Sequence, residues 1–260
     1  MKKKVLFLML PSLVGFFAIY IIPFIYSLSY SFTDNAFKMN FIGINNYIKI
    51  WQNNYFQLAI KNTFIFTLVS VPLIMIYSMA VALIMVYIGK KYQFLKNIVF
   101  LPVILPSASI AIFWNIYFDS MNPMLSLIII YVWKYSGLNV MVLLSALTNV
   151  DSIIYDAANI DGASFINKAL NITIPNIMPS IFFTFILSLV NSFKIYSESF
   201  LLYGNYPDNS VYMIQNYLNN HFLKLNYQNI STAACIFALI VYSIVAVLLI
   251  IEKKWSNKIW

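Results

Sequence analysis

Three ionisable residues, Lys134, Lys194 and Glu198, lie within long apolar runs of the sequence. An ionisable side chain costs about 2.5–3.5 kcal/mol inside hydrocarbon on insertion scales, so such residues are functional candidates by default. Lys194 and Glu198 stand four residues apart, which lets them face each other on one helix and neutralise each other. The alternative is that this helix face, with Tyr196, lines a pathway for a polar solute that hydrogen bonds and ring stacking would hold.

Two neutral polar residues in the same apolar runs extend the set of pathway candidates. Asn139 and Asn191 each offer an amide donor and an amide acceptor. Lys134 has two interpretations, a structural tie to another helix or a contact with the solute, and the sequence leaves both open.

Few residues of this chain could serve as catalytic groups or metal ligands. It has one Cys and one His, whereas a disulfide framework needs pairs and a zinc site needs three or four ligands. No Gly-x-x-x-x-Gly-Lys-Ser/Thr motif for binding ATP phosphates is present. The sequence therefore predicts no catalytic residue, no metal site and no cofactor bound by this chain.

The composition indicates that a membrane is the solvent of this chain. Hydrophobic residues make up 62% of its 260 residues and charged residues 9%, against roughly 25% charged in soluble domains. The net charge of +8 comes from lysines, but they are not gathered on one face beside stacking aromatics as nucleic-acid binding requires. They lie mostly at the ends of apolar runs, which the orientation rule and anionic lipid explain.

Six continuously apolar stretches are long enough to cross a bilayer as helices, which takes about 20 residues. The lack of ten-residue alternation argues against a β-barrel. We therefore predict an all-α integral membrane protein made of one membrane domain, residues 1–260. The predicted spans are Val5–Leu28, Ile60–Ile88, Asn97–Phe118, Met124–Leu147, Ile177–Tyr203 and Ile230–Ile251.

Lysine placement predicts the orientation of these spans. With both termini in the cytoplasm, ten lysines lie inside and four outside, in agreement with the positive-inside rule. The inside lysines are Lys2, Lys3, Lys4, Lys90, Lys91, Lys96, Lys168, Lys253, Lys254 and Lys258, and the outside ones are Lys38, Lys49, Lys61 and Lys224. This orientation places residues 149–176, between spans four and five, in the cytoplasm.

The segment 149–176 has the pattern of two short helices. Asp151 and Asp161 stand where N-caps stand, Gly162 joins the helices, and Pro175 and Pro179 are expected to end the second one. With one cation, Lys168, the segment is weakly basic for a helix that lies on lipid headgroups. Docking into a groove of a partner protein fits better. Its apolar positions are Ile153, Ile154, Ala157, Ala158, Phe165, Ile166, Ala169 and Leu170.

The same segment resembles the signature loop of ABC-importer permeases, which reads Glu-Ala-Ala, three residues, Gly, nine residues, Ile-x-Leu-Pro. Here the corresponding residues are Asp156-Ala157-Ala158, then Gly162, then Ile172-Thr173-Ile174-Pro175, with both gaps matching. Asp156 replaces Glu and Ile174 replaces Leu. The resemblance implies coupling helices that insert into a cleft on a separate ATPase subunit, carried by Asp156, Ala157, Ala158, Asp161, Gly162, Ile172 and Pro175.

The resemblance extends along nearly the whole chain and is to the carbohydrate-type permeases of the maltose- and glycerol-phosphate-like first branch. It is carried by the stretches "LPSLVGFFAIYIIPFIYSLSYSFTD", "FIGINNYIKIW", "IVFLPVILPSASIAIFWNIYF" and "SFKIYSESFLLYG". The Gly-Gly-Gly-Pro usual after span five is replaced by "YGNYPDNS", and the turn between spans three and four is shorter than in the family. These departures affect the substrate assignment and the outer loops.

The resemblance implies half of the translocation pathway of an ATP-driven, binding-protein-dependent importer in a bacterial cytoplasmic membrane. The expected solute is a sugar or a related polyol or glycerophosphodiester, on a pathway lined by spans four to six. The expected partners are a second, homologous permease, two ATP-binding subunits that hold ATP and Mg, and an extracytoplasmic solute-binding protein. Two alternatives stay open: a permease for a non-sugar solute, and an ion-gradient carrier, which would usually have internal repeats and midplane carboxylates.

Overall fold

We describe the fold from a computed structural model that describes residues 2–35, 38–89, 92–118 and 120–259. Regular structure in these residues is helical, which confirms the all-α prediction, and an isolated bridge pairs Thr33 with Phe41. Within the described ranges, five helices are long and apolar enough to cross a membrane. The number becomes six if a bent pair counts as one span.

The contacts within the chain divide it into two compact units. One comprises the chain up to Ala59 together with Asn216–Tyr242, and the other comprises Ile60–Gln215 and the chain from Ser243 onward. The prediction of one membrane domain stays a prediction.

The first unit begins with a continuous helical run. Its parts are α1 (Lys2–Phe16), the π-helical turn η1 (Phe17–Ile21) and α2 (Ile22–Ser31). In the π turn the Ile22 N–H donates to the Phe17 carbonyl, five residues back. Pro23 follows directly, and because its ring crowds the preceding turn, a locally wider turn lets the helix continue. The predicted span Val5–Leu28 lies within this run.

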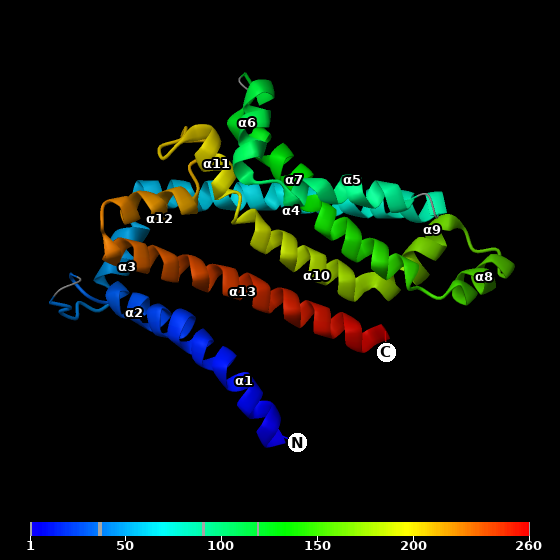
Figure 1. Ribbon diagram of the computed structural model, residues 1–260, viewed down its shortest axis with the longest axis horizontal. Helices are drawn as coiled ribbons and strands as arrows, with labels where there is room; N and C mark the ends of the chain where they lie inside the picture. The colour runs from blue at the N-terminus through cyan, green and yellow to red at the C-terminus, as the bar shows by residue number, and fades with distance from the viewer. Residues whose placement is uncertain (1, 36–37, 90–91, 119, 260) are drawn as a thin grey trace. The chain divides into compact units, whose positions relative to one another are not determined.

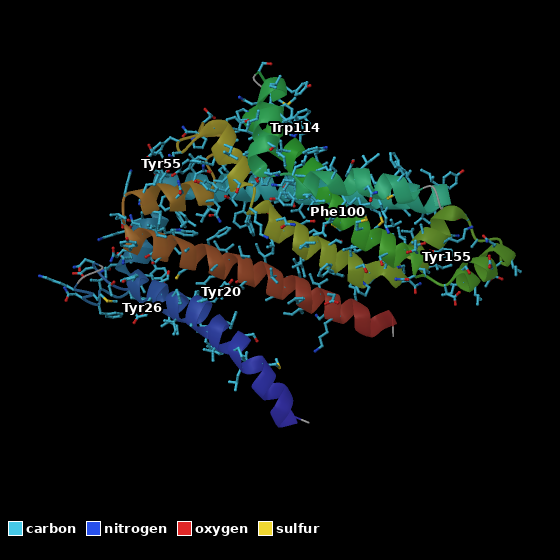
Figure 2. All side chains as sticks on the ribbon, viewed as in Figure 1. Tyr20, Tyr26, Tyr55, Phe100, Trp114 and Tyr155 are labelled. Carbon is cyan, nitrogen blue, oxygen red and sulfur yellow. The ribbon has the colours of Figure 1, made fainter. Side chains whose placement is uncertain are left out.

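Polar contacts near Ser31 join the end of α2 to other helices of the first unit. Its further helices are α3 (Asn45–Trp51), most of α12 (Ile214–Leu223) and the first half of α13 (Tyr227–Ile259). Asn46 Nδ2 donates to the Ser31 carbonyl at 3.1 Å, and the Ser31 and Tyr47 hydroxyls lie 2.7 Å apart. Tyr20 and Tyr26 project from the first run (Figure 2) and are exposed, as expected of aromatic side chains in lipid or at its interface.

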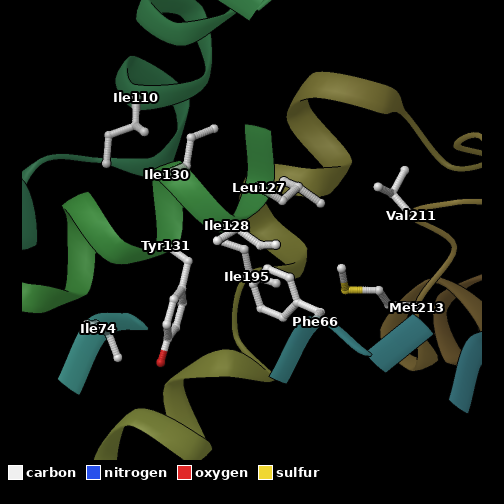
Figure 3. Close-up of a cluster of buried hydrophobic side chains, with 10 residues drawn as sticks. All are labelled: Phe66, Ile74, Ile110, Leu127, Ile128, Ile130, Tyr131, Ile195, Val211 and Met213. Carbon is white, nitrogen blue, oxygen red and sulfur yellow. The ribbon is translucent and has the colours of Figure 1, made fainter. Parts of the chain in front are cut away.

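The second unit is organised around α7. Its elements are the rest of α4 (Asn54–Ile88), α5 (Tyr92–Ile104), α6 (Ser107–Phe118), α7 (Pro123–Thr148), α8 (Ser152–Ile160), α9 (Phe165–Lys168), η3 (Ala169–Thr173), α10 (Ile174–Ser192), α11 (Tyr196–Tyr203) and the last part of α13. In its apolar stretch 61% of α7 is buried, and α7 packs against α5 and α10. Figure 3 shows the core at its first turns: Phe66, Ile74, Ile110, Leu127, Ile128, Ile130, Tyr131, Ile195, Val211 and Met213.

A glycine sets the close approach of α5 to α7. A Cβ added at Gly137 would overlap the carbonyl oxygen of Val99 and would lie 3.1 Å from the Phe100 Cα. Small residues at such contacts let helix backbones pack closely in a membrane, where dispersion replaces the hydrophobic effect as the driving force between helices.

The predicted third span, Asn97–Phe118, is not one continuous helix. Helix α5 ends at Ile104, α6 begins at Ser107, and the two are bent by 96° (Figure 1). Pro106 stands in the break, where its ring and its missing N–H prevent the helix from continuing. This correction makes the third span a broken or re-entrant one.

The predicted fifth span, Ile177–Tyr203, is also interrupted. Helix α10 ends at Ser192 and α11 begins at Tyr196. The three remaining predictions, Ile60–Ile88, Met124–Leu147 and Ile230–Ile251, lie within α4, α7 and α13 and are confirmed as helices.

Many large apolar side chains of the second unit are exposed, among them Leu68, Ile76 and Ile112. In water, contiguous apolar surface of this kind is an aggregation liability. In hydrocarbon it is the expected outer surface of a helix bundle, because lipid tails solvate it. The exposure therefore agrees with the apolar composition.

Candidate functional site

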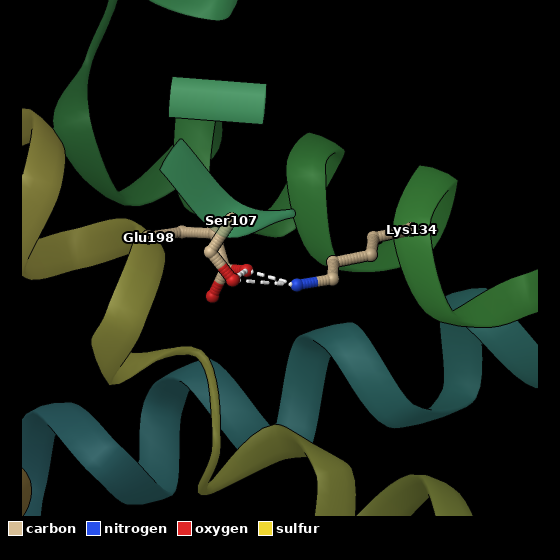
Figure 4. A network of polar contacts seen from close by, with 3 residues as sticks. All are labelled: Ser107, Lys134 and Glu198. Atoms are coloured by element: carbon tan, nitrogen blue, oxygen red, sulfur yellow. Dashed lines mark hydrogen bonds and ion pairs between the residues drawn. The ribbon is translucent and has the colours of Figure 1, made fainter. Parts of the chain in front are cut away.

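A buried ion pair lies between two helices of the second unit. The Lys134 ammonium group on α7 contacts the Glu198 carboxylate on α11. The Ser107 hydroxyl bridges the pair, because it accepts from Lys134 Nζ at 2.9 Å and donates to Glu198 Oε1 at 2.7 Å (Figure 4). Glu198 is fully buried, so its charge depends on these two partners for stabilisation.

The network joins the bent third span and the fifth span, which has a turn at residues 193–195, to the continuous helix α7. Ser107 is the first residue of α6, immediately after the 96° bend, and Glu198 lies in the first turn of α11, after the α10–α11 break. Lys134 comes from the continuous helix α7. A movement of α11 away from α7 would part a buried charge from its partner, and a movement of α6 would remove the Ser107 hydroxyl from the pair.

The predicted pairing of Lys194 with Glu198 is wrong. Phe193, Lys194 and Ile195 form the turn between α10 and α11, so the two charges do not share one helix. Lys194 is exposed there, and its backbone N–H donates to the Asn191 carbonyl at 2.9 Å. The first of the two interpretations of Lys134, a tie to another helix, is the one that the geometry supports.

The side of α7 that meets α10 carries further buried polar groups. Tyr131 donates its hydroxyl proton to the Ser188 carbonyl at 2.6 Å, and Asn139 Nδ2 donates to the Ser188 hydroxyl at 2.6 Å. Asn139 Oδ1 and Glu198 Oε2, however, have no hydrogen-bond partner. Buried polar atoms are usually satisfied, so these two acceptors, one on α7 and one on α11, are candidates for contact with a solute or with water.

The structure gathers some of the predicted pathway residues and separates others. Lys134, Asn139 and Glu198 lie along the contacts of α7 with α10 and α11. Asn191 is buried at the end of α10, and Tyr196 is half-buried, with its ring 5.8 Å from that of Phe200.

Sequence reasoning missed two members of the polar network, Ser107 and Ser188. A serine inside an apolar run is common, so neither stands out by type. For Ser107 a signal did exist, because it follows Pro106, and a residue just after a helix-breaking proline is a probable start of the next helix. Among the residues with described positions, no three His, Cys, Asp or Glu side chains gather as metal ligands would.

Of the two short helices predicted after α7, one is separate, α8, whereas the second, α9 with η3, continues into α10 without a break. Helix α8 has a well-defined beginning and end. Asp151 caps its start by accepting from the Ile153 N–H at 3.0 Å. At its end the Ala163 N–H donates to the Ala158 carbonyl and the Gly162 N–H to the Asn159 carbonyl. This is the Schellman pattern, in which the residue after the C-cap adopts a left-handed conformation.

Gly162 occupies that left-handed position, with a φ of 72°. A Cβ added there would have nothing within 4 Å. Backbone conformation, rather than close approach of another surface within this chain, is therefore what requires glycine at this position.

Two details of the predicted loop are wrong. Asp161 is the C-cap residue of α8 and not the N-cap of a second helix. Ser164 stands at the start of α9 instead, where its hydroxyl accepts from the Asn167 N–H at 3.3 Å. Pro175 and Pro179 do not end the helix: the π turn η3 before Pro175 absorbs its ring, and the chain stays helical through α10.

Helix α8 and the α9–η3 stretch are tied together while their apolar side chains stay exposed. The hydroxyl groups of Tyr155 and Thr173 lie 2.8 Å apart, and Lys168 Nζ donates to Asn159 Oδ1 at 2.7 Å. Of the predicted coupling residues, Asp156 and Ala157 are exposed and Ala158, Ile172 and Pro175 are half-buried. The exposed apolar side chains are Ile153 (70%), Ile154, Ile160 (87%), Ile166 and Leu170.

Comparison with known proteins adds a family match over almost the whole chain. The profile of the family described as "Binding-protein-dependent transport system inner membrane component" matches residues 5–256. The lactose transport system permease protein LacF of Rhizobium radiobacter is 28% identical over 80% of this chain and 79% of its own length. The arabinooligosaccharides transport system permease protein AraP of Bacillus subtilis is 25% identical over 81% of this chain and 75% of its own.

Solved structures share the fold. A chain of a bacterial ABC transporter involved in the import of the acidic polysaccharide alginate superposes with a TM-score of 0.81 at 23% identity. The match covers 97% of this chain and 96% of that one. A second chain comes from a bacterial alginate ABC transporter in complex with an alginate pentasaccharide-bound periplasmic protein, with a TM-score of 0.76 at 21% identity.

Proposed function

The chain belongs to the family of binding-protein-dependent transport system inner membrane components, and from this premise we propose that it is the permease subunit of an ATP-driven sugar importer. The observation that carries the proposal is the family match over residues 5–256. In such a complex this chain forms part of the pathway through the membrane, and the energy comes from another subunit.

The solute class is a sugar or a related polyol or glycerophosphodiester. Relatives named for transport of lactose and of arabinooligosaccharides support this class. A hydroxyl-rich solute needs hydrogen-bond acceptors inside the membrane, and the unpartnered oxygens Glu198 Oε2 and Asn139 Oδ1 are such acceptors. The half-buried Tyr196 offers an aromatic face for an apolar sugar ring. We assign Lys134, Asn191 and Lys194 to the same pathway as flanking polar groups.

The loop 149–176 couples this chain to a separate ATPase subunit. Ile153 and Ile160 are large, apolar and exposed on a capped short helix, which is the form of an anchor in a partner's groove. ATP and Mg belong to that partner, and the residues that dock are those of the signature: Asp156, Ala157, Ala158, Asp161, Gly162, Ile172 and Pro175.

The complete importer has four further subunits by this proposal: a second, different permease, two ATP-binding subunits and a solute-binding protein outside the cell. One solved relative was crystallised with its periplasmic binding protein, which supports the last of these for this chain. Both termini and the coupling loop lie in the cytoplasm, and the complex resides in the bacterial cell membrane.

Mild affinity purification of this chain from its native membrane, followed by mass spectrometry, tests the proposal. Co-purification of an ATPase, a second permease and a binding protein is the expected result. Proteoliposomes of that complex should then take up the binding protein's sugar only with ATP inside. A chain that is purified alone, under conditions that keep other importers assembled, would contradict the proposal.

A further inference from the structure

A cavity of about 370 Å³ lies between the coupling segment and the bundle. This volume is within the range of about 300–1,000 Å³ typical of small-molecule sites. Met79 and Leu83 of α4 and Ile177 and Ile181 of α10 form its apolar walls. The segment α8–η3 closes its other side.

The polar groups of the cavity gather on that other side. Lys168 and Asn159 line it and are hydrogen-bonded to each other at 2.7 Å. Tyr155 and Thr173 line it as well, with their hydroxyls paired. No carboxylate is among the described residues that line the cavity, and Lys168 is its one cation. The site therefore combines an apolar interior with a positive rim.

We propose that this cavity binds an anionic phospholipid, with an acyl chain between α4 and α10 and the phosphate on Lys168. Water could bind only on the polar side and would leave the apolar walls without a favourable contact. A free phosphate would leave those walls without contact. A phospholipid satisfies both parts at once, because its chain matches Met79 and Ile181 and its charge matches Lys168.

The place of the cavity along the chain agrees with a lipid. Met79 and Leu83 lie in the last third of α4, and Ile177 lies near the beginning of α10, where spans leave the hydrocarbon. In the proposed orientation this is the cytoplasmic leaflet, where anionic lipids concentrate. One lysine is too few to hold a helix flat on a charged surface, but it is enough for one headgroup at a shaped site.

A lipid at this position would bridge the coupling segment and two spans. Asn159 and Lys168 belong to the segment, whereas Leu83 and Ile181 belong to the bundle. The inference goes beyond the proposed function, because it requires a membrane but neither a sugar nor an ATPase. The lipid proposal can therefore be contradicted while the transport proposal holds, and the transport proposal can be contradicted while the lipid proposal holds.

Native mass spectrometry of the full-length chain in detergent tests the proposal. The delipidated protein is titrated with phosphatidylglycerol and with phosphatidylcholine of the same acyl chains. We expect the wild type to retain phosphatidylglycerol preferentially. Lys168→Gln should lower that preference about fivefold, since one lysine near anionic lipid contributes roughly that factor. Lys168→Arg should keep it, and Lys253→Gln, which removes an exposed lysine elsewhere, should change nothing.

Variants that fill the cavity provide a second test of the lipid proposal. Ala169 lines it, and Ala169→Phe should lower retention of both lipids severalfold. If that variant does not fold, Leu83→Trp on α4 fills the same space from the opposite side. Equal retention of the two lipids by the wild type, or an unchanged preference in Lys168→Gln, would overturn the proposal. Millimolar inorganic phosphate that displaces all bound lipid would also overturn it, because the site would then be an anion site without a chain pocket.

Discussion

Lys134 and Glu198 form an ion pair between an unbroken helix and a helix that follows a break, and Glu198 is fully buried. The Ser107 hydroxyl adds the beginning of a third helix to the same pair. Ser107 follows the bend between α5 and α6, and Glu198 follows the turn between α10 and α11, so the network ties both elements to the continuous helix α7. The contribution of the ion pair to the stability of the protein can be measured.

We expect Lys134→Met to destabilise the protein strongly. Removing one partner leaves the Glu198 carboxylate buried without its charge partner, which in other proteins costs about 3–5 kcal/mol. The double variant Lys134→Met with Glu198→Leu should recover most of the loss, because an apolar pair of similar volume needs no desolvated charge. The measurement is the unfolding midpoint of the purified chain in detergent.

Lys194→Met is the matched control for the ion-pair test. Lys194 is exposed and lies in the turn between α10 and α11, so its replacement should change stability by less than about 0.5 kcal/mol. If Lys134→Met and the double variant were equally unstable, the lost packing of the lysine stem, and not the unpaired carboxylate, would explain the loss.

We expect Gly137→Ala to push α5 away from α7. The added methyl group would overlap the Val99 carbonyl oxygen, and overpacking of this kind typically costs about 1–3 kcal/mol. Gly15→Ala is the matched control: Gly15 also lies in a helix, and a Cβ there meets nothing within 4 Å. That control should be neutral or gain up to about 1 kcal/mol from helix propensity. Equal unfolding midpoints for the two variants would argue against the close α5–α7 contact.

The sequence predicts the continuous spans well and the interrupted ones poorly, for a physical reason. Apolar composition reports burial in lipid or protein, and the stretch around Pro106 is as apolar as its neighbours. Whether the helix bends there depends on which groups of other helices replace the backbone hydrogen bonds lost at Pro106. A single sequence does not show those tertiary contacts. The same holds for Glu198: its i, i+4 neighbour Lys194 is visible in the sequence, whereas its partner Lys134 is 64 residues away. Local motifs, such as the Asp151 cap and Gly162, need no distant partner and were predictable.

We expect Ile160→Asp to uncouple transport without unfolding the chain. Ile160 is 87% exposed, so a polar replacement costs little in the isolated protein. As an anchor in a partner's groove, it should contribute as binding hot spots do, about 2 kcal/mol or roughly 30-fold in affinity. The measurement is retention of the ATPase subunit on the purified permease, together with binding-protein-stimulated ATP hydrolysis.

Leu223→Asp serves as the control for the docking test. Leu223 is also exposed and apolar, but it lies in α12, far along the chain from the coupling segment. Its replacement should leave ATPase retention unchanged. Gly162→Leu is a poorer probe of docking, because the φ of 72° strains any side chain there. Gly162→Asn tolerates that conformation better and should retain more ATPase than Gly162→Val. Unchanged retention in Ile160→Asp would contradict a docking role for α8.

We expect the folded protein to lose stability in mildly acidic solution because of His221. Burial, and then the nearby Lys224 charge, hold the pKa of His221 below its ordinary value. Its ring lies 4.4 Å from that of Tyr217, and its Nδ1 has no hydrogen-bond partner. The neutral form is thus the folded form, and the unfolded chain takes up the proton first. Stability is fully present above the unfolded pKa, near 6.5, and is lost as the pH falls through that value towards the folded pKa.

The chain has a single histidine, so its imidazole resonance can be titrated by NMR without assignment, alongside unfolding midpoints from pH 8 to pH 5. We expect a depressed titration midpoint and a declining unfolding temperature in the wild type, and a flatter profile in His221→Phe. Lys224→Gln should move the titration midpoint part of the way back, since it removes the repelling charge but not the burial. Carboxylates titrate near pH 4 and contribute little above pH 5. A midpoint at or above the ordinary histidine value would contradict the burial of the His221 ring beside Tyr217.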